Sequence, residues 1–203
     1  MAPTSEPLTP ERVLDVTEAV LRRHGSAKTT VIDVARALGV SHATVYRHFR
    51  TKAALREAVV KRWLDHTTAA LTAVVTEDRD PESRLRDWLA ALFAFKRRTS
   101  SDDPELFAAY RVLGTGLGDA VSAHLDVLTT QLTQIIEVGA DAGVFITTDP
   151  TTSARAVFHA TGLFHDPRYF RDWAQHDIEA QFDAVVELVL RGLRARTSRP
   201  PGA

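Results

Sequence analysis

The sequence contains no cysteine, and it has no hydrophobic run near the ~18 residues that a membrane-spanning helix requires. The first absence excludes disulfides, thiolate metal ligands and a cysteine redox sensor. The N-terminal segment also lacks the basic start and apolar core of a secretory signal peptide. These absences favour a cytoplasmic protein without a membrane partner. The 203 residues, 44% of them hydrophobic, suffice for one or two domains with a sizeable core.

Motifs for catalysis and metal binding are absent as well. The eight histidines form no H-E-x-x-H pattern, and His159 and His165 are too far round a helix to share one face. There is no G-x-S-x-G motif, and the glycines at 114, 116 and 118 lack the Lys-Ser/Thr end of a phosphate loop. We therefore predict no catalytic residue, no metal site and no cofactor, which disfavours an enzyme.

Charge is unevenly distributed along the chain. Residues 1–62 hold 11 Lys and Arg against 6 Asp and Glu, a net of +5. The remaining residues hold 14 against 20, a net of −6. Chance unevenness would explain these numbers alone. A basic end on an acidic body is nonetheless typical of a chain whose basic part faces a polyanion.

The most informative stretch covers residues 29–55 and has the pattern of two short helices joined by a tight turn. An apolar stripe at helical spacing runs through Val34 and Leu38. Thr30 is a good N-cap for this first helix. Gly39 follows at the position where a helix end favours a left-handed residue. The first helix is therefore expected to end at this glycine.

The second helix of this stretch is predicted to begin after Ser41, another good N-cap, and to bury Val45 and Phe49. Its remaining positions are dense in side chains that can contact DNA. A short turn containing glycine between two such helices is the signature of a helix-turn-helix, whose second helix enters the major groove.

The run resembles the DNA-binding segment of TetR-type transcriptional regulators. The resemblance covers roughly residues 10–60, about a quarter of the chain. It is specific, because spacing and residue type agree across both helices and into the next. The matching residues are Thr30, Val34, Ala35, Leu38, Gly39, Val40, Ser41, Thr44, Val45, Tyr46, Arg47, His48, Phe49, Lys52 and Leu55.

Contacts with DNA are expected from the second helix and from two neighbouring helix starts. His42, Thr44 and Arg47 can reach base edges, while the resemblance implies phosphate contacts for Tyr46 and His48. Helix starts supply further phosphate-binding groups. The alternatives are that Tyr46 belongs to the core and that His42 is merely on the surface. The predicted DNA-binding residues are Lys28, Thr30, Ser41, His42, Thr44, Tyr46, Arg47, His48 and Lys52.

The whole chain has the pattern of an all-α protein with about nine helices. Four Asp-Pro pairs mark helix starts, because Asp caps a helix and Pro suits its first position. Besides helices from 10 to about 24 and from 52 to about 75, helices are expected over 81–100, 104–113, 119–141, 150–165 and 168–195. The predicted organisation is a disordered leader (1–8), a three-helix DNA-binding domain with the helix-turn-helix (9–51), a larger helical ligand-binding and dimerisation domain (52–196) and a tail (197–203).

The resemblance implies that the helical body binds a small-molecule effector. Aromatic and apolar side chains at helical spacing are the candidates for its pocket, and they favour a mainly apolar ligand with a few polar anchors. The alternative is that this stripe is simply core. The candidate pocket residues are Trp88, Leu92, Phe95, Phe107, Tyr110 and Phe158.

A single helix-turn-helix makes few contacts, so a homodimer on a palindromic operator in double-stranded DNA is expected. The last two helices have wide apolar faces that suit a four-helix interface, as in the resembled family, or packing on the chain's own core. The candidate interface residues are Val157, Leu163, Phe182, Val185, Val186, Val189 and Leu193. The sequence thus predicts a DNA-binding regulator, a repressor released by a small ligand. The alternatives are a helical ligand-binding module without DNA binding and a small helical enzyme.

Overall fold

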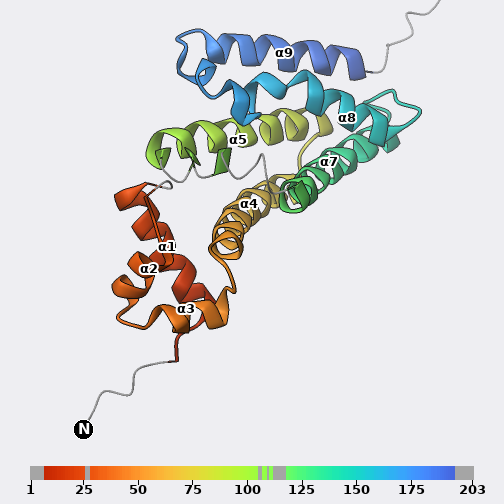
Figure 1. Cartoon of the computed structure of the whole chain (residues 1–203). Helices are drawn as coiled ribbons and strands as arrows, with labels where there is room; N and C mark the ends of the chain where they lie inside the picture. The colour runs from red at the N-terminus through yellow and green to blue at the C-terminus, as the bar shows by residue number, and fades with distance from the viewer. Residues whose placement is uncertain (1–6, 26–27, 105–106, 109, 112–117, 195–203) are drawn as a thin grey trace, which may run out of the picture. The chain divides into compact units, whose positions relative to one another are not determined.

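The computed structural model describes residues 7–25, 28–104, 107–108, 110–111 and 118–194 (Figure 1). These residues form eight α-helices and no strand, which confirms the predicted all-α class. The described residues between 104 and 111 are also helical, where a further helix was predicted. The predicted tail, most of the leader and the segment 112–117 lie outside the described residues.

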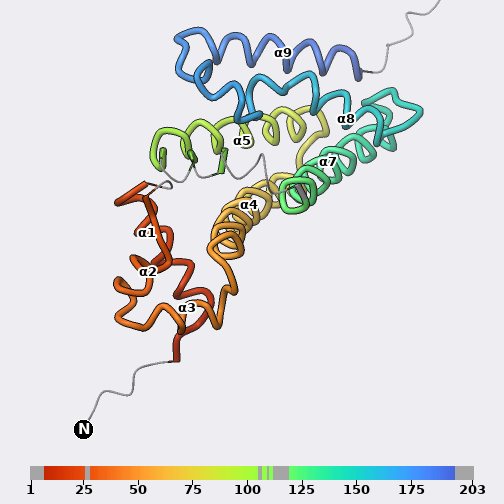
Figure 2. Tube along the Cα trace, viewed as in Figure 1, coloured from red at the N-terminus to blue at the C-terminus, as the bar shows by residue number. Residues whose placement is uncertain are grey.

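Figure 2 follows the chain through the helices in order. Their bounds are α1 (Pro10–His24), α2 (Val31–Leu38), α3 (His42–His48), α4 (Lys52–Thr76), α5 (Pro81–Asp102), α7 (Gly118–Asp141), α8 (Pro150–Ala160) and α9 (Ile178–Leu193). Three single-turn 3-10 helices, Gly162–Phe164, Pro167–Tyr169 and Asp172–Ala174, connect α8 to α9.

The chain divides into two compact units. The first comprises Met1–Asp65 and Thr99–Val121, and the second comprises His66–Arg98 and Ser122–Ala203. The first unit extends beyond the boundary predicted at residue 51, because the start of α4 belongs to its core. The side chains of that core are Val13, Val20, Val31, Val34, Ala35, Val45 and Leu55.

Three aromatic rings join α5, α9 and the first 3-10 turn in the core of the second unit. The ring centroid of Phe93 on α5 lies 5.4 Å from that of Phe164 and 5.1 Å from that of Phe182 on α9. The last two centroids are 5.2 Å apart, with the rings nearly perpendicular. Such edge-to-face packing fixes how these elements meet.

The last two helices are shorter than predicted. α8 ends at Ala160 rather than 165, and α9 begins at Ile178 rather than 168. The segment between them satisfies its polar groups locally, because the Trp173 indole donates to the Leu163 carbonyl at 2.7 Å and Asp166 caps only a 3-10 turn. An Asp-Pro pair marks a cap, but it does not distinguish a single turn from a long helix.

At the end of α7, the Gly139 backbone and the Phe145 ring lie in close contact. The Gly139 carbonyl accepts hydrogen bonds from the Val144 and Phe145 amides at 2.9 and 3.0 Å, and Gly143 has a left-handed φ of 70°. A Cβ on Gly139 would overlap the Phe145 ring, which is 3% exposed. Glycine is thus required at 139 by space.

Among the helices described, none combines the length and the apolar character needed to cross a membrane.

Candidate functional site

The helix-turn-helix is built by caps at both helix starts and a shared apolar core. Thr30 and Asp33 form a reciprocal capping box on α2, and Gly39 ends that helix in the left-handed conformation with φ 70°. Ser41 caps α3 by accepting from the Thr44 amide at 3.2 Å. Val45 is fully buried and fixes α3 against the core. The predicted caps and turn are therefore confirmed.

One face of α3 is left exposed and polar. His42 and Arg47 are exposed, and the Tyr46 side chain is 39% exposed, so Tyr46 is not a core residue. The His42 and Tyr46 rings meet edge to face with centroids 6.3 Å apart. An Arg47 nitrogen lies 3.4 Å from the Thr44 hydroxyl, which also contacts Ser41 at 2.9 Å. These contacts order the exposed face without removing its donors from solvent.

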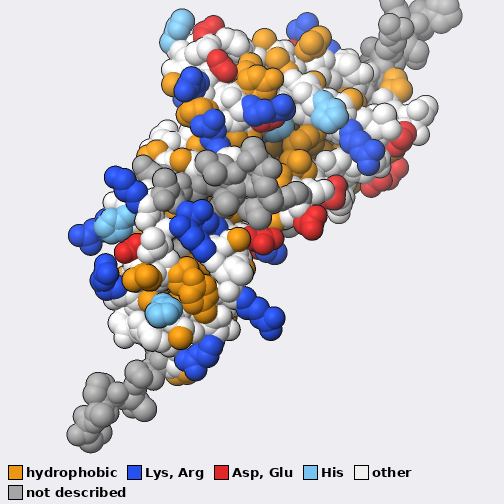
Figure 3. All heavy atoms as spheres, in the orientation of Figure 1, with side chains coloured by type: hydrophobic (Ala, Val, Ile, Leu, Met, Phe, Trp, Pro, Cys, Tyr) orange, Lys and Arg blue, Asp and Glu red, His pale blue; other side chains and the backbone are white. Residues whose placement is uncertain are grey.

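Two helix starts flank this face with further polar groups. Lys28 and Thr30 are exposed at the start of α2, where hydrogen bonds from the Thr30 hydroxyl and amide lower the pKa of Asp33. At the start of α4, the Thr51 hydroxyl accepts from the Ala54 amide at 2.9 Å. Partial burial, with a smaller effect of the nearby Arg56 charge, lowers the pKa of Lys52. In the view of Figure 3, Lys and Arg side chains surround the N-terminal helices.

Ion pairs attach α4 to α1 within the first unit. Arg62 on α4 donates to Glu18 through its Nε at 2.9 Å and to Asp15 at 2.7 Å. The Arg62 and Glu18 side chains are 20% and 16% exposed, so solvent screens this pair less than a surface pair. The contact stabilises the packing that supports the helix-turn-helix, and no local sequence pattern predicted it.

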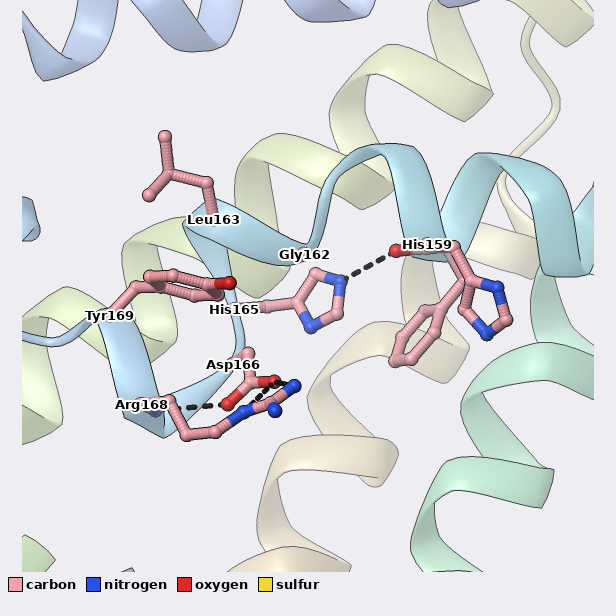
Figure 4. A pocket seen from close by; sticks show the side chains of 8 residues that line it. His159, Gly162, Leu163, His165, Asp166, Arg168 and Tyr169 are labelled. Carbon is pink, nitrogen blue, oxygen red and sulfur yellow. Dashed lines mark hydrogen bonds and ion pairs between the residues drawn. The ribbon is translucent and has the colours of Figure 1, made fainter.

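A cavity of about 450 Å³ lies in the second unit, beside the turns that follow α8 (Figure 4). The His165 ring points back to the end of α8, where its Nε2 lies 3.0 Å from the Phe158 carbonyl oxygen. Because a carbonyl only accepts, Nε2 carries the proton. The cavity is lined by Phe158, His159, Gly162, Leu163, His165, Asp166, Arg168 and Tyr169.

Three basic side chains of the second unit are buried and act on one another electrostatically, and we call Lys96, His124 and His165 the basic cluster. They are 3%, 5% and 8% exposed, respectively. Of the three, His165 lines the cavity. Burial lowers the pKa of Lys96 to about 8, with the Asp166 charge opposing it. Burial and then the Lys96 charge lower the pKa of His124 to about 3. Burial also lowers the pKa of His165 to about 4, against the hydrogen bond to Phe158.

The residues predicted for the pocket fall into different environments. Trp88 is fully buried and donates to Gln131 at 3.0 Å, as a core residue does, and Leu92 is 1% exposed. Phe95 is half-buried on α5. Phe107 and Tyr110 belong to the core of the first unit. Of the predicted set, Phe158 lines the cavity.

Sequence reasoning missed the basic cluster, although Lys96 left a readable signal. It continues the buried stripe of Leu85, Leu89 and Leu92 on α5 at helical spacing. A lysine on such a stripe must be buried, and buried ionisable groups cluster at functional sites. The histidines gave no comparable signal, because the three members of the basic cluster come from separate segments of the chain. No group of three or more metal-binding side chains occurs in the described ranges.

Four residues predicted for the dimer interface lie in the core of the single chain: Val157, Phe182, Val186 and Leu193. Phe182 is held there by the aromatic contacts with Phe93 and Phe164. A side chain already covered by its own chain offers little area to a second copy. In the single chain, this buried face of α9 contributes to the core of the second unit.

A different face of α9 remains accessible. Leu188 is 72% exposed, and Val185 and Val189 beside it are half-buried. Leu163 is half-buried in the first 3-10 turn after α8. These side chains keep the prediction of an α8–α9 interface open.

Comparisons with known proteins agree with this architecture. The family model described as "Bacterial regulatory proteins, tetR family" matches residues 13–59. The model described as "Tetracyclin repressor-like, C-terminal domain" matches residues 81–186, which is more than half of the chain. The first match covers the helix-turn-helix, and the second covers most of α5 to α9.

Individual proteins are similar at low identity. The nucleoid occlusion factor SlmA of Vibrio atlanticus is 26% identical over 138 residues, 67% of this chain and 70% of that protein. For SlmA of Vibrio vulnificus, the match covers 55% of this chain and 58% of that protein, again at 26% identity.

Solved structures share the fold over nearly the whole chain. SmeT, the repressor of the Stenotrophomonas maltophilia multidrug efflux pump SmeDEF, superposes with a TM-score of 0.67 at 21% identity, covering 97% of this chain and 95% of that one. A second SmeT structure is a complex with triclosan, with a TM-score of 0.66 at 20% identity, covering 96% and 95%. With both parts of the chain matched by their family models, this chain belongs to the TetR family of bacterial transcriptional regulators, which are DNA-binding transcription factors and not enzymes.

Proposed function

We propose that the chain represses transcription as a homodimer bound to a palindromic DNA operator, and that a small ligand in the second unit releases it. The observation that carries this proposal is the exposed polar face of α3. This helix is capped at its start and held by Val45 in the core, and it leaves His42, Tyr46 and Arg47 accessible. Such a helix is suited to the major groove.

The side chains of α3 divide into base-reading and phosphate-binding groups. Arg47 suits a bidentate contact to guanine, while His42 and Thr44 can reach neighbouring base edges. The hydrogen bond between Arg47 and Thr44 supports an Arg47 held along the helix face. Tyr46 and His48 suit phosphate contacts, which set the position of the helix on the duplex.

The starts of α2 and α4 would fix α3 in the groove from either side. Lys28, Thr30 and the amides at the α2 start suit one phosphate. Lys52 and the α4 start suit another. The lowered pKa of Lys52 favours a phosphate partner, because an anion stabilises its charged form.

The operator would be palindromic because two copies bind it. Val185, Leu188 and Val189 form an apolar strip on α9 that the single chain leaves partly uncovered. A second copy related by a two-fold axis would bury this strip against the same strip. Half-sites would then lie about one helical turn, ~34–36 Å, or a multiple apart.

The test is selection of genomic DNA fragments by the purified chain, followed by footprinting. We expect a protected palindrome and an affinity that falls steeply with salt, because phosphate contacts release counterions. Failure to enrich any fragment at low salt would leave a ligand-binding module without DNA binding.

A matched pair of variants makes this test specific to α3. Arg47→Ala removes a cation from the exposed face of α3, whereas Lys61→Ala removes an exposed cation that pairs with Asp65 on α4. The first should lose binding to the selected fragment, and the second should retain it. Equal losses would indicate non-specific attraction by the basic N-terminal part rather than recognition by α3.

A further inference from the structure

His165 is a buried histidine whose protonation pattern is set by its surroundings. The residue is 8% exposed, and its Nε2 lies 3.0 Å from the Phe158 carbonyl oxygen, to which it must donate. A neutral imidazole with its proton on Nε2 carries a lone pair on Nδ1. Burial, by lowering the pKa of His165 to about 4, keeps the ring neutral at pH 7. His165 therefore presents a hydrogen-bond acceptor on its second nitrogen.

This Nδ1 acceptor opens into the cavity beside the turns that follow α8. His165 belongs to the lining of that cavity, and in Figure 4 its nitrogen without a dashed line points to the side on which Asp166 and Arg168 lie. Within the described ranges, no group donates to Nδ1, and protein atoms do not enclose it completely. An acceptor held in one direction by a buried ring favours a ligand that carries a donor.

The charged side chains of the cavity neutralise each other. The Arg168 Nε donates to one Asp166 carboxylate oxygen at 2.8 Å, and the Arg168 backbone amide donates to the other at 2.9 Å. Among the lining residues that the structure describes, these two carry the full charges at neutral pH. Because the pair has no net charge, the cavity favours a neutral ligand over a carboxylic acid or an amine.

The other walls of the cavity are aromatic or apolar. The Phe158 ring lies 4.2 Å from the His165 ring, with their planes 30° apart. Tyr169 is 42% exposed and Leu163 is half-buried, so both leave apolar surface for a ligand to cover. The volume of about 450 Å³ lies within the ~300–1,000 Å³ typical of small-molecule sites. A flat ligand of one or two aromatic rings suits these walls.

We propose that the effector is a neutral phenol whose hydroxyl group donates to the Nδ1 of His165 and accepts from Arg168, and whose ring packs on Phe158 and Tyr169. This inference rests on the proposed function, because it names the ligand class of the same regulatory unit. A hydroxyl group suits this position, since it donates to an acceptor and accepts from a donor at once. A carboxylate has no proton to share with Nδ1, and an ammonium would meet the Arg168 charge.

The test is equilibrium dialysis of the full chain at pH 7 against 2-naphthol and against two analogues that lack its donor. In 2-methoxynaphthalene a methyl group replaces the hydroxyl proton, and naphthalene has neither, so its weak binding would not be due to added bulk. We expect naphthol to bind with a Kd below about 1 mM and both analogues to bind roughly fivefold to a hundredfold more weakly. The reason is that they leave the Nδ1 acceptor without a donor.

Three variants locate the site. His165→Phe keeps a ring but removes the acceptor, so it should weaken naphthol by a similar factor and leave naphthalene unchanged, whereas a misfolded chain would lose both. Tyr169→Leu, at a largely exposed side chain, removes an aromatic wall and should weaken both ligands. His176→Phe, at a side chain that is 98% exposed, is the matched control and should bind like the unchanged protein.

Several results would overturn the proposal. Equal affinity for naphthol and its two analogues would contradict recognition of a donor, and it needs no variant to be seen. Tighter binding of 2-naphthoate than of naphthol would indicate a site for anions instead. Undiminished naphthol binding by both His165→Phe and Tyr169→Leu would place the site elsewhere. The absence of saturable naphthol binding up to about 1 mM would also contradict it.

Binding to DNA is measured separately, on a fragment selected by the unchanged protein. Release of that fragment by naphthol, and not by its methyl ether, would support both the site and its regulatory role. Naphthol binding without any DNA binding would refute the proposed function and leave the ligand site standing. DNA binding without naphthol binding would refute the phenol site and leave the DNA-binding regulator standing.

Discussion

Replacing His124 by phenylalanine is expected to raise the free energy of unfolding, although the change removes a native side chain. Both ring nitrogens are buried without a partner in the described part of the chain. An unsatisfied buried polar group costs ~1–3 kcal/mol, whereas an apolar group of similar shape avoids that cost. The phenyl ring is larger than the imidazole, and the strain of fitting it into the same space offsets part of the gain. We expect a net gain of ~1 kcal/mol at pH 7, or ~2–4 °C in Tm for a chain of this size.

The gain should grow as the pH falls, which makes the prediction specific to this imidazole. Burial, followed by the charges of Lys96 and His165, lowers the pKa of His124 to about 3. The unfolded chain takes up a proton near the ordinary histidine pKa of ~6.5, while the folded chain resists it until about pH 3. The stabilising contribution of the neutral His124 is therefore fully present above about pH 6.5, and it is lost progressively as the pH falls from 6.5 towards 3. At pH 5 the loss from one such histidine is ~2 kcal/mol.

The assay is thermal or urea unfolding of both proteins between pH 5 and 7. His165, whose pKa burial lowers to about 4, still contributes its own acid sensitivity in the variant. His124→Phe should therefore show about half of the pH dependence of the unchanged protein across this range. His176→Phe should change stability by no more than ~0.5 kcal/mol, because the replaced ring is in solvent. A lower Tm in both His124→Phe and His124→Leu, or an unchanged pH dependence, would refute the reasoning.

Three further predictions concern the DNA-binding face and the end of α7. Tyr46→Phe should weaken operator binding by ~1 kcal/mol with an unchanged Tm, because one hydroxyl contact to phosphate is lost; equal affinity in a gel-shift titration would exclude that contact. Arg47→Ala should cost ~1–3 kcal/mol and relax base preference at one position of each half-site, and an unaltered binding-site profile would contradict base reading. Gly139→Ala should destabilise the chain by ~1–3 kcal/mol in urea unfolding, since its Cβ overlaps the Phe145 ring. Adding Phe145→Leu should recover part of that loss, and strictly additive effects would indicate that the overlap is not the cause.

The helix-turn-helix could be predicted from the sequence because local rules determine it. The capping box of Thr30, the left-handed Gly39 and the cap at Ser41 each depend on residues within four positions. Periodicity then gave the buried stripe to which Val45 belongs. The exposed face of α3 could then be predicted as the positions of the helix that do not belong to the buried stripe.

The second unit could be predicted only as a set of helices. Its cavity and basic cluster combine α5, α7 and the turns after α8, and pairing between distant segments has no local pattern. The wide apolar face of α9 was compatible with a core or with a second copy, and Phe182 and Val186 are buried within the single chain. The 3-10 turns were missed because an Asp-Pro pair marks where a helix begins but does not indicate how long that helix is.

The departures from local rules are themselves informative about where regulation resides. In the first unit, Thr9, Thr30, Ser41 and Thr51 each cap the helix start that follows them, so the helix-turn-helix is built for a fixed shape. In the second unit, a lysine occupies an apolar stripe and His124 is buried without a partner, both of which reduce stability. Natural chains keep such costs chiefly at functional sites. A group that forms hydrogen bonds with both His124 ring nitrogens would remove the cost of leaving them unsatisfied. Such a group would bind only the folded unit, so its affinity and the stability that it adds are linked.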